Sequence, residues 1–273
     1  MTKQKKSGKK TSGGRSSLDT SKVQTLDGRR GMSVTTRFIG MLVAIACVFL
    51  LMYIQDYHRA EKSVASATVS TQDVVVEKGD AAMVFRPVQG GDTGLIFYPG
   101  SKVQHTAYAP LMQMLAQRGV FCVLVEMPFR LPLLDRSAAG VYPADYPEIK
   151  NWFLGGHSLG GNVAADYAAK HPEELTGLVL LGAYASKDLS GSNLPVLSIV
   201  GEFDTVIDRD KLEQNRIYLP QSAQELTISG GNHAGFGSYG KQDKDGQATI
   251  TAAEQQEQTA QLIASWMSSL QGE

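Results

Sequence analysis

Short apolar runs alternate with stretches of helical pattern, and this alternation constrains the fold more than any other feature of the chain. The runs lie at residues 94–98, 120–125, 152–154, 178–181, 196–200 and 225–228. Near-continuous apolar runs of this length are typical of strands that are buried on both faces. Helical stretches between them provide the crossovers that parallel strands require. We therefore predict an α/β fold with a mostly parallel central sheet and helices on both faces.

An antiparallel hairpin is predicted just before this region. Residues 73–77 and 81–85 flank Lys78-Gly79-Asp80, a turn-forming tripeptide. Residues 55–70 are small and polar and predict a linker, so the folded domain is expected to span residues 71–273. A domain of this size supports a single core.

The N-terminal segment combines a basic tail with an uncharged apolar run. Residues 1–37 contain ten Lys and Arg but only two Asp, a net charge of +8, and their composition predicts a disordered tail. Residues 38–54 carry no charge and are just long enough to cross a bilayer. Positive residues stay on the cytoplasmic side. We therefore predict a single-pass membrane anchor with a cytoplasmic N-terminus and an extracellular C-terminal domain.

Three other interpretations of the apolar run are less favoured. Cleavage of a signal peptide at Ala65-Ser66-Ala67 would occur well beyond the end of the run. A lipoprotein signal cleaved before Cys47 would not need the seven apolar residues that follow the cysteine. A buried core helix would need covering neighbours on every side, because the run is apolar on all faces.

Charge and cysteine content exclude several classes of site. The whole chain has a net charge of −1, so the part after residue 37 carries −9, which argues against a nucleic acid partner. The two cysteines, Cys47 and Cys122, lie in regions that are not expected to meet, and no disulfide is predicted. No cluster of Cys and His has the spacing of a zinc site. We expect neither a metal nor an organic cofactor.

Ser158 lies in the pentapeptide Gly156-His157-Ser158-Leu159-Gly160, between an apolar run and a helix-prone stretch. A pentapeptide of the form G-x-S-x-G is common by chance, and Ser158 could simply cap the helix. The order of strand, tight turn and helix is what makes this motif a nucleophile elbow. We therefore predict that Ser158 is a catalytic nucleophile.

A serine nucleophile requires a base and a carboxylate that orients the base. In an open parallel sheet such groups collect beyond the carboxyl ends of the strands. His233 lies in a Gly-rich loop directly after the last predicted strand, and Asp204 follows the strand before it. Glu202 is the main rival of Asp204, whereas Asp208 and Asp210 are predicted to cap the next helix. The other histidines suit the position less well: His58, His105, His157 and His171.

The negatively charged oxygen of a tetrahedral intermediate needs two backbone N–H donors. One is expected from Leu159, directly after the nucleophile. The other is expected from the loop after the first predicted parallel strand. Ser101 is the preferred donor in that loop, with Gly100 and Lys102 as alternatives.

The order Ser158, Asp204, His233 resembles that of the α/β-hydrolases, and the resemblance covers about residues 72–270. Residues 97–103 and the elbow are similar to a compact bacterial group near the dienelactone hydrolases. Those enzymes use a cysteine nucleophile where this chain has serine, so their chemistry is not implied. Their usual His-Gly oxyanion motif is replaced here by Pro99-Gly100.

Substrate recognition is less clearly encoded. Residues 183–195 are too short for a large cap, and residues 130–150, with three prolines, could form a small flap. Lys102 and Glu126 follow strands and are candidate substrate-binding residues. A structural carboxylate at Glu126 and a solvated Lys102 are the simpler alternatives.

These features together predict a membrane-anchored serine hydrolase that forms an acyl-enzyme on Ser158. Its substrate would be a small-molecule ester, thioester or amide. Two alternatives are acyl transfer to an alcohol or amine by the same residues and an inactive hydrolase fold that serves as a binding module.

Overall fold

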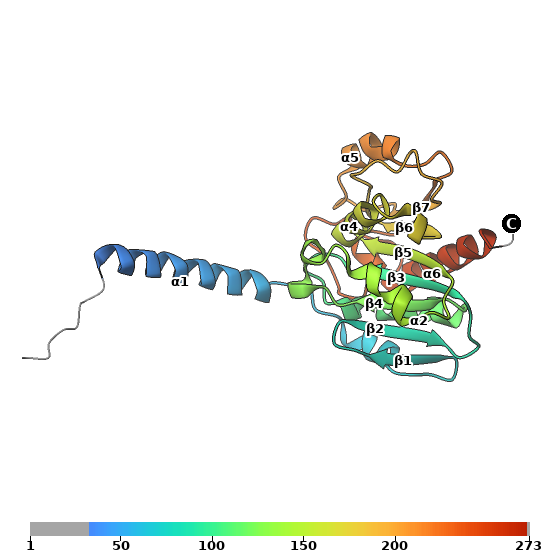
Figure 1. Ribbon diagram of the computed structural model, residues 1–273, viewed down its shortest axis with the longest axis horizontal. Coiled ribbons are helices and arrows are strands. Elements are labelled where there is room, and N and C mark those ends of the chain that lie inside the picture. The colour runs from blue at the N-terminus through green and yellow to red at the C-terminus, as the bar shows by residue number, and fades with distance from the viewer. Residues whose placement is uncertain (1–32, 272–273) are drawn as a thin grey trace, which may run out of the picture. The chain divides into compact units, whose positions relative to one another are not determined.

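The computed structural model describes residues 33–271, so most of the predicted basic tail lies outside the described residues (Figure 1). The chain divides into two units, one up to Phe49 and one from Leu50 onward. Helix α1, Val34–Gln55, contains the described part of the first unit and crosses the boundary. It has no buried side chain, and an 18-residue stretch of it has a mean hydropathy of 2.4. In the described part of the chain, α1 is the one helix whose length and composition suit a membrane span.

A single eight-stranded sheet forms the centre of the second unit, in the order β1-β2-β4-β3-β5-β6-β7-β8 (Figure 1). Strands β1 and β2 form the predicted hairpin, and β2 pairs with β4 in antiparallel fashion. All other neighbours are parallel, which confirms the predicted fold class. The strands are β1 Val74–Lys78, β2 Ala82–Pro87, β3 Thr93–Tyr98, β4 Phe121–Val125, β5 Asn151–His157, β6 Gly177–Leu181, β7 Val196–Gly201 and β8 Gln224–Ile228.

Helices cover both faces of the sheet, and the strands alternate their side chains between two cores. Leu95 and Phe97 of β3 belong to the core beneath α2 and α6, whereas Ile96 and Tyr98 belong to the core beneath α4. This is the two-residue period of a strand with apolar layers on both sides. The helices of this unit are α2 Ala109–Gln117, α3 Tyr142–Asp145, α4 Leu159–Ala168, α5 Arg209–Gln214 and α6 Ala252–Ser269.

The stretch predicted as a linker, residues 55–70, packs onto the domain. It contains the 3₁₀ helix η1, Lys62–Thr68, where Val64 and Ala67 are buried. The two side chains are three residues apart and so lie on the same face of a 3₁₀ helix. Earlier still, His58 forms a β-bridge with Val103. The folded part therefore starts before Thr71, because small apolar residues here find a partner surface on α2 that composition does not reveal.

The insertion between β4 and β5 forms short helical turns: η3 Pro128–Arg130, η4 Pro132–Leu134, η5 Ala138–Val141 and α3. It is fixed to the sheet, since the N–H of Ala139 donates to the Tyr98 hydroxyl at 2.7 Å. Between β6 and β7 the chain forms no helix. The carboxyl edge of the sheet therefore has little or no cap, as predicted.

Candidate active site

Ser158 is the single residue between β5 and α4 and has a strained backbone, with φ 53° and ψ −127°. A non-glycine residue with positive φ is uncommon and is found mainly where function requires it. The Ser158 N–H donates to the carbonyl of Leu181, at the end of β6, at 2.9 Å. The strand, turn and helix expected around the motif are therefore present, and the turn is tied to the neighbouring strand.

The glycines of the motif allow backbone segments to approach more closely than a side chain permits. A Cβ atom on Gly160 would lie 2.2 Å from the carbonyl oxygen of Pro99. On Gly156 it would lie 2.6 Å from the carbonyl carbon of Gly160. The start of α4 thus presses against both β5 and the loop after β3. This contact brings the nucleophile turn and the predicted oxyanion loop together.

His233 and Asp204 form a buried pair, with Nδ1 of the histidine 2.7 Å from Oδ2 of the carboxylate. Each residue is about 1% exposed. The other carboxylate oxygen of Asp204 accepts the N–H groups of Val206 and Ile207, at 3.0 and 2.9 Å. Because a carboxylate can only accept, Nδ1 carries the hydrogen and Nε2 of His233 is left as a proton acceptor. Among the described residues, this Nε2 is buried and has no hydrogen-bond partner.

Gly182, just after β6, makes room for this pair. Its φ is +51°, and a Cβ atom there would lie 2.9 Å from Nδ1 of His233 and 3.0 Å from Oδ2 of Asp204. From the other side, the Arg209 guanidinium donates to the carbonyls of Gly201 and Asp204, at 2.8 and 3.1 Å. The turn after β7 is therefore held at both ends.

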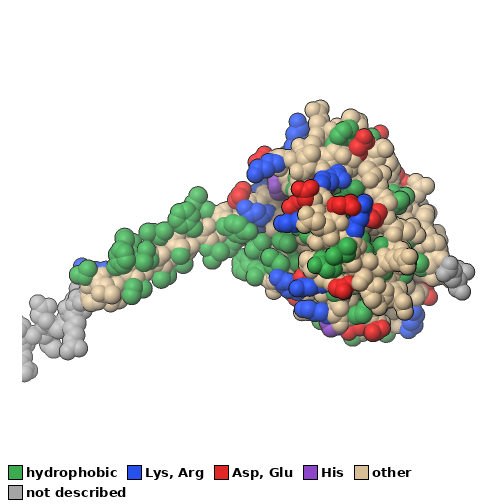
Figure 2. Space-filling view, turned by 90° about the horizontal axis from the view of Figure 1, so that it is seen from above, with side chains coloured by type: hydrophobic (Ala, Val, Ile, Leu, Met, Phe, Trp, Pro, Cys, Tyr) green, Lys and Arg blue, Asp and Glu red, His purple; other side chains and the backbone are tan. Residues whose placement is uncertain are grey.

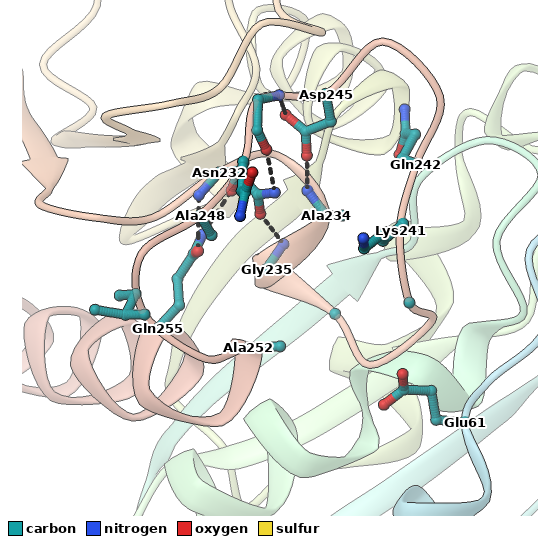
Figure 3. Close-up of a pocket in the computed structure, with 15 residues that line it drawn as sticks. Glu61, Asn232, Ala234, Gly235, Lys241, Gln242, Asp245, Ala248, Ala252 and Gln255 are labelled. Carbon is teal, nitrogen blue, oxygen red and sulfur yellow. Dashed lines mark hydrogen bonds between the residues drawn. The ribbon is translucent and has the colours of Figure 1, made fainter.

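A hydrogen-bonded network supports the loop that carries His233 (Figure 3). The Asp245 carboxylate accepts the N–H groups of His233 and Ala234, at 3.2 and 2.8 Å. Gln255, fully buried on α6, bonds both backbone groups of Asn232. Asn232, Ala234, Asp245 and Gln255 line a pocket of about 400 Å³, and neither Ser158 nor His233 is among its lining residues. The pocket therefore lies behind the histidine loop and not at the nucleophile.

Ser158 and His233 line a different, smaller pocket of about 190 Å³. Its other lining residues include Leu159, Asn162, Tyr184, Val206 and Ile207. The sequence singled out only Leu159 among these five. The structure thus brings the predicted nucleophile, base and first oxyanion donor to one cavity.

Hydrogen bonding within the loop after β3 distinguishes the candidates for the second oxyanion donor. The N–H of Gly100 donates to the Tyr108 hydroxyl at 3.1 Å. The N–H of Lys102 donates to the Arg130 carbonyl at 2.9 Å. The N–H groups of Ser101 and Leu159 have no acceptor in the described part of the chain. The N–H of Ser101 is therefore left free, although Ser101 is not among the residues that line the Ser158 pocket, and its role as the second oxyanion donor stays a prediction.

Two buried residues that the sequence did not assign to the site connect its parts. Besides binding Gly100, the Tyr108 hydroxyl lies 2.7 Å from Nδ1 of His157. Burial, with a smaller contribution from nearby His233, lowers the pKa of His157 well below its ordinary value. The His157 ring is therefore neutral, and its centre lies 4.4 Å from that of His233. Tyr108 and His157 thus connect the loop after β3, the end of β5 and the predicted base His233.

Comparison with known proteins identifies the family. The sequence profile of the alpha/beta hydrolase family matches residues 94–257, which include Ser158, Asp204 and His233. The chain belongs to the α/β-hydrolase family. A protein of Mycobacterium phage D29 named “Putative non-heme haloperoxidase” is 26% identical over 108 residues, 36% of this chain and 39% of that protein. The chain thus matches less than half the length of that relative.

Solved structures share the fold of this hydrolase. The hyperthermophilic esterase of the archaeon Pyrobaculum calidifontis superposes with a TM-score of 0.51 at 18% identity, covering 75% of this chain and 89% of the esterase. A soluble variant of the monoglyceride lipase of Saccharomyces cerevisiae superposes with a TM-score of 0.53 at 13% identity, covering 75% and 96%. The narrower resemblance to the group near the dienelactone hydrolases stays a prediction.

The two predicted substrate-binding residues lie outside the hydrolase pocket at Ser158. Glu126 lies 3.6 Å from Nδ1 of His105 and lines a separate pocket of about 280 Å³. Lys102 donates to the Asp56 carboxylate at 2.7 Å. Neither residue lines the Ser158 pocket, and their role in substrate binding stays a prediction. Within residues 33–271, no group of three or more His, Cys, Asp or Glu is arranged to bind a metal.

Replacing Tyr108 with phenylalanine is expected to destabilise the hydrolase. The change leaves the Gly100 N–H and His157 Nδ1 without their buried partner, a loss of about 1–3 kcal/mol in the free energy of unfolding. Urea denaturation of the full chain in detergent measures it. Tyr218→Phe is the matched control, since the Tyr218 hydroxyl makes no hydrogen bond within the described residues. An equal effect of the two substitutions would contradict the assigned role.

Proposed function

We propose that this hydrolase cleaves a carboxylic ester, or a related thioester or amide, through an acyl-enzyme on Ser158. The observation that carries the proposal is the unpartnered, buried Nε2 of His233 beside an elbow serine in the same pocket. Such a nitrogen, with Asp204 on the opposite side of its ring, is free to accept the proton of a serine, although no hydrogen bond joins it to Ser158 in this structure. The pairing of His233 with Asp204 favours catalysis over the binding-module alternative.

The reaction begins when the Ser158 oxygen attacks the carbonyl carbon and its proton passes to Nε2 of His233. Asp204 stabilises the imidazolium that forms. The N–H groups of Leu159 and Ser101 donate to the carbonyl oxygen as it becomes negative, a contribution of about 3–4 kcal/mol for each donor. His233 then returns the proton to the leaving group. Water, activated by the same histidine, releases the acyl group from Ser158.

We further propose that α1 anchors this hydrolase in a membrane with the domain on the extracellular side. The length, hydropathy and uncharged centre of α1 support an anchor. Removal of the helix at the candidate cleavage site is disfavoured, because Ala65-Ser66-Ala67 lies within η1 and Ala67 is only 5% exposed. Cleavage there would remove Val64, which is buried, and His58, which pairs with Val103.

A fluorophosphonate probe tests the acyl-enzyme. The full chain in detergent is expected to gain one adduct, which peptide mass spectrometry locates on Ser158. The labelled protein should also lose its ability to hydrolyse p-nitrophenyl butyrate. Heat-denatured protein, which has the same serines without the elbow, is the control and should remain unlabelled. Folded protein that takes no label, or takes it on another serine, would refute the proposal.

A further inference from the structure

We propose that this hydrolase holds the entrance to its active site against the bilayer that α1 spans, and that its substrate is an acyl ester residing in that bilayer. The inference rests on the proposed function and names the substrate class. Two observations support it. Residues 56–58, which we call the tether, connect α1 to the loop after β3, and apolar and cationic side chains are exposed around this tether.

The tether is only a few residues long. Helix α1 ends at Gln55, and His58 already bonds the loop after β3: its N–H donates to the Lys102 carbonyl at 2.7 Å, and its carbonyl accepts the Gln104 N–H at 2.9 Å. Three residues span at most about 10 Å. Lys102 directly follows Ser101, the proposed oxyanion donor. The active-site loop therefore lies next to the end of α1 whatever direction the helix takes.

Aromatic and cationic side chains surround the tether. The Arg130 guanidinium lies 3.6 Å from the centre of the Tyr57 ring, and the Lys102 ammonium lies 4.3 Å from the centre of the Tyr53 ring. Tyrosines, lysines and arginines are enriched at the level of the lipid headgroups. Asp56 pairs with Lys102 and offsets one positive charge, but Arg59 and Arg130 leave a net positive charge, which anionic headgroups attract. This part of the domain therefore has the composition of a membrane interface.

Three exposed apolar side chains, which we call the apolar rim, lie in the turns η3 and η4, next to the loop after β3. They are Phe129, Leu133 and Leu134, which are 60%, 43% and 57% exposed. The backbone that carries Phe129 is strained, because Phe129 and Arg130 both have positive φ. Figure 2 shows hydrophobic side chains gathered on this side of the domain, with both cationic and acidic side chains around them. Apolar groups collected in this way indicate an interaction surface.

The apolar rim borders the catalytic elements directly. Lys102, next to Ser101, donates its N–H to the carbonyl of Arg130 in η3. Turn η4, which carries Leu133 and Leu134, packs against α4, the helix whose first residue is the donor Leu159. We assign the bilayer as the partner of the apolar rim, because the tether holds this part of the domain close to the end of the membrane helix α1.

Pocket size leads to the same class of substrate. The cavity at Ser158 has a volume of about 190 Å³, less than a site that encloses a drug-sized ligand. It accommodates the ester and a short stretch of its acyl chain. The remainder of a long chain would stay among the rim side chains and the lipid tails, so the hydrolase has no need to extract it.

The test uses the full chain in phosphatidylcholine vesicles containing phosphatidylglycerol, with two esters. One is p-nitrophenyl butyrate in the aqueous phase, and the other is a fluorogenic long-chain ester embedded in the vesicle. The rim variant is Phe129→Ser, Leu133→Ser and Leu134→Ser combined. We expect it to keep the butyrate rate within twofold and to lose at least tenfold on the embedded ester. Butyrate hydrolysis also reports that the rim variant is folded.

Serine substitutions at exposed apolar residues elsewhere provide the matched control. Val88 and Ile217 are 57% and 72% exposed and lie outside the apolar rim. Val88→Ser combined with Ile217→Ser should leave both rates unchanged. If the rim variant behaves like this control on both esters, the inference is wrong. If the wild type hydrolyses neither ester, the proposed function fails instead.

A second measurement decides docking without any turnover. Leu134→Cys in a Cys47→Ser background is labelled with an environment-sensitive dye, while Cys122 stays buried and unlabelled. The dye should shift to the blue and be quenched by brominated lipids, whereas dye on Ile217→Cys should not. Absence of quenching at residue 134 would overturn docking even in a hydrolase that cleaves both esters.

Discussion

Substitution of Ser158 by alanine is expected to lower kcat for p-nitrophenyl butyrate by roughly 10⁴- to 10⁶-fold. The alanine side chain cannot form the acyl-enzyme, so only binding and oxyanion stabilisation by the rest of the pocket would remain. The strained turn tolerates the change, since alanine has the same Cβ as serine and fits the space that Gly156 and Gly160 leave. The variant should therefore fold, and its rate measures the nucleophile alone.

Ser66→Ala is the control for this experiment, because Ser66 is exposed on η1 and bonds only the nearby Ser63 carbonyl. It should retain the wild-type rate. Circular dichroism of both variants checks that they are folded. A folded Ser158→Ala protein with more than a few per cent of the wild-type kcat would show that another group attacks the ester.

The fold was predictable from local pattern because its strands are buried on both faces. A run such as residues 178–181 has no polar face in any register, so its sequence alone indicates an interior parallel strand. The packing of residues 55–70 was not predictable in this way. Val64 and Ala67 are small residues in a polar stretch, and their burial depends on α2, more than forty positions later in the chain.

The proposed catalytic residues were chosen by position, because catalytic groups in this architecture follow the carboxyl ends of strands. Asp204 and His233 are two such residues, and the structure brings them into contact. The supporting residues carry no such signal. Tyr108 lies within a helix start and bonds His157 across 49 positions, and Asp245 lies in a loop with no regular structure. Their roles arise only from tertiary contacts that a single sequence does not encode locally.

Substitution of Asp204 by asparagine is expected to lower kcat by about 10³- to 10⁴-fold. A loss of this size is typical when the orienting carboxylate becomes an amide and the histidine adopts the wrong tautomer. The N–H groups of Val206 and Ile207 require an oxygen at the Oδ1 position, so the asparagine oxygen should take that place. Its NH₂ group then faces Nδ1 of His233 and donates to it. The ring hydrogen must move to Nε2, which can no longer accept the proton of Ser158.

Glu202→Gln is the matched control, since Glu202 was the rival for the acid role and lies two residues away. Its carboxylate accepts the Gly230 N–H at 2.7 Å, a bond that the glutamine oxygen can also form. Steady-state kinetics with p-nitrophenyl butyrate should give this variant a kcat within about threefold of the wild type, because a neutral amide oxygen replaces a charged acceptor at only one part-buried hydrogen bond. A larger loss in Glu202→Gln than in Asp204→Asn would reassign the acid. If it is Asp204 that orients His233, fluorophosphonate labelling of Ser158 should slow in parallel with kcat, since both reactions need the same proton transfer to Nε2.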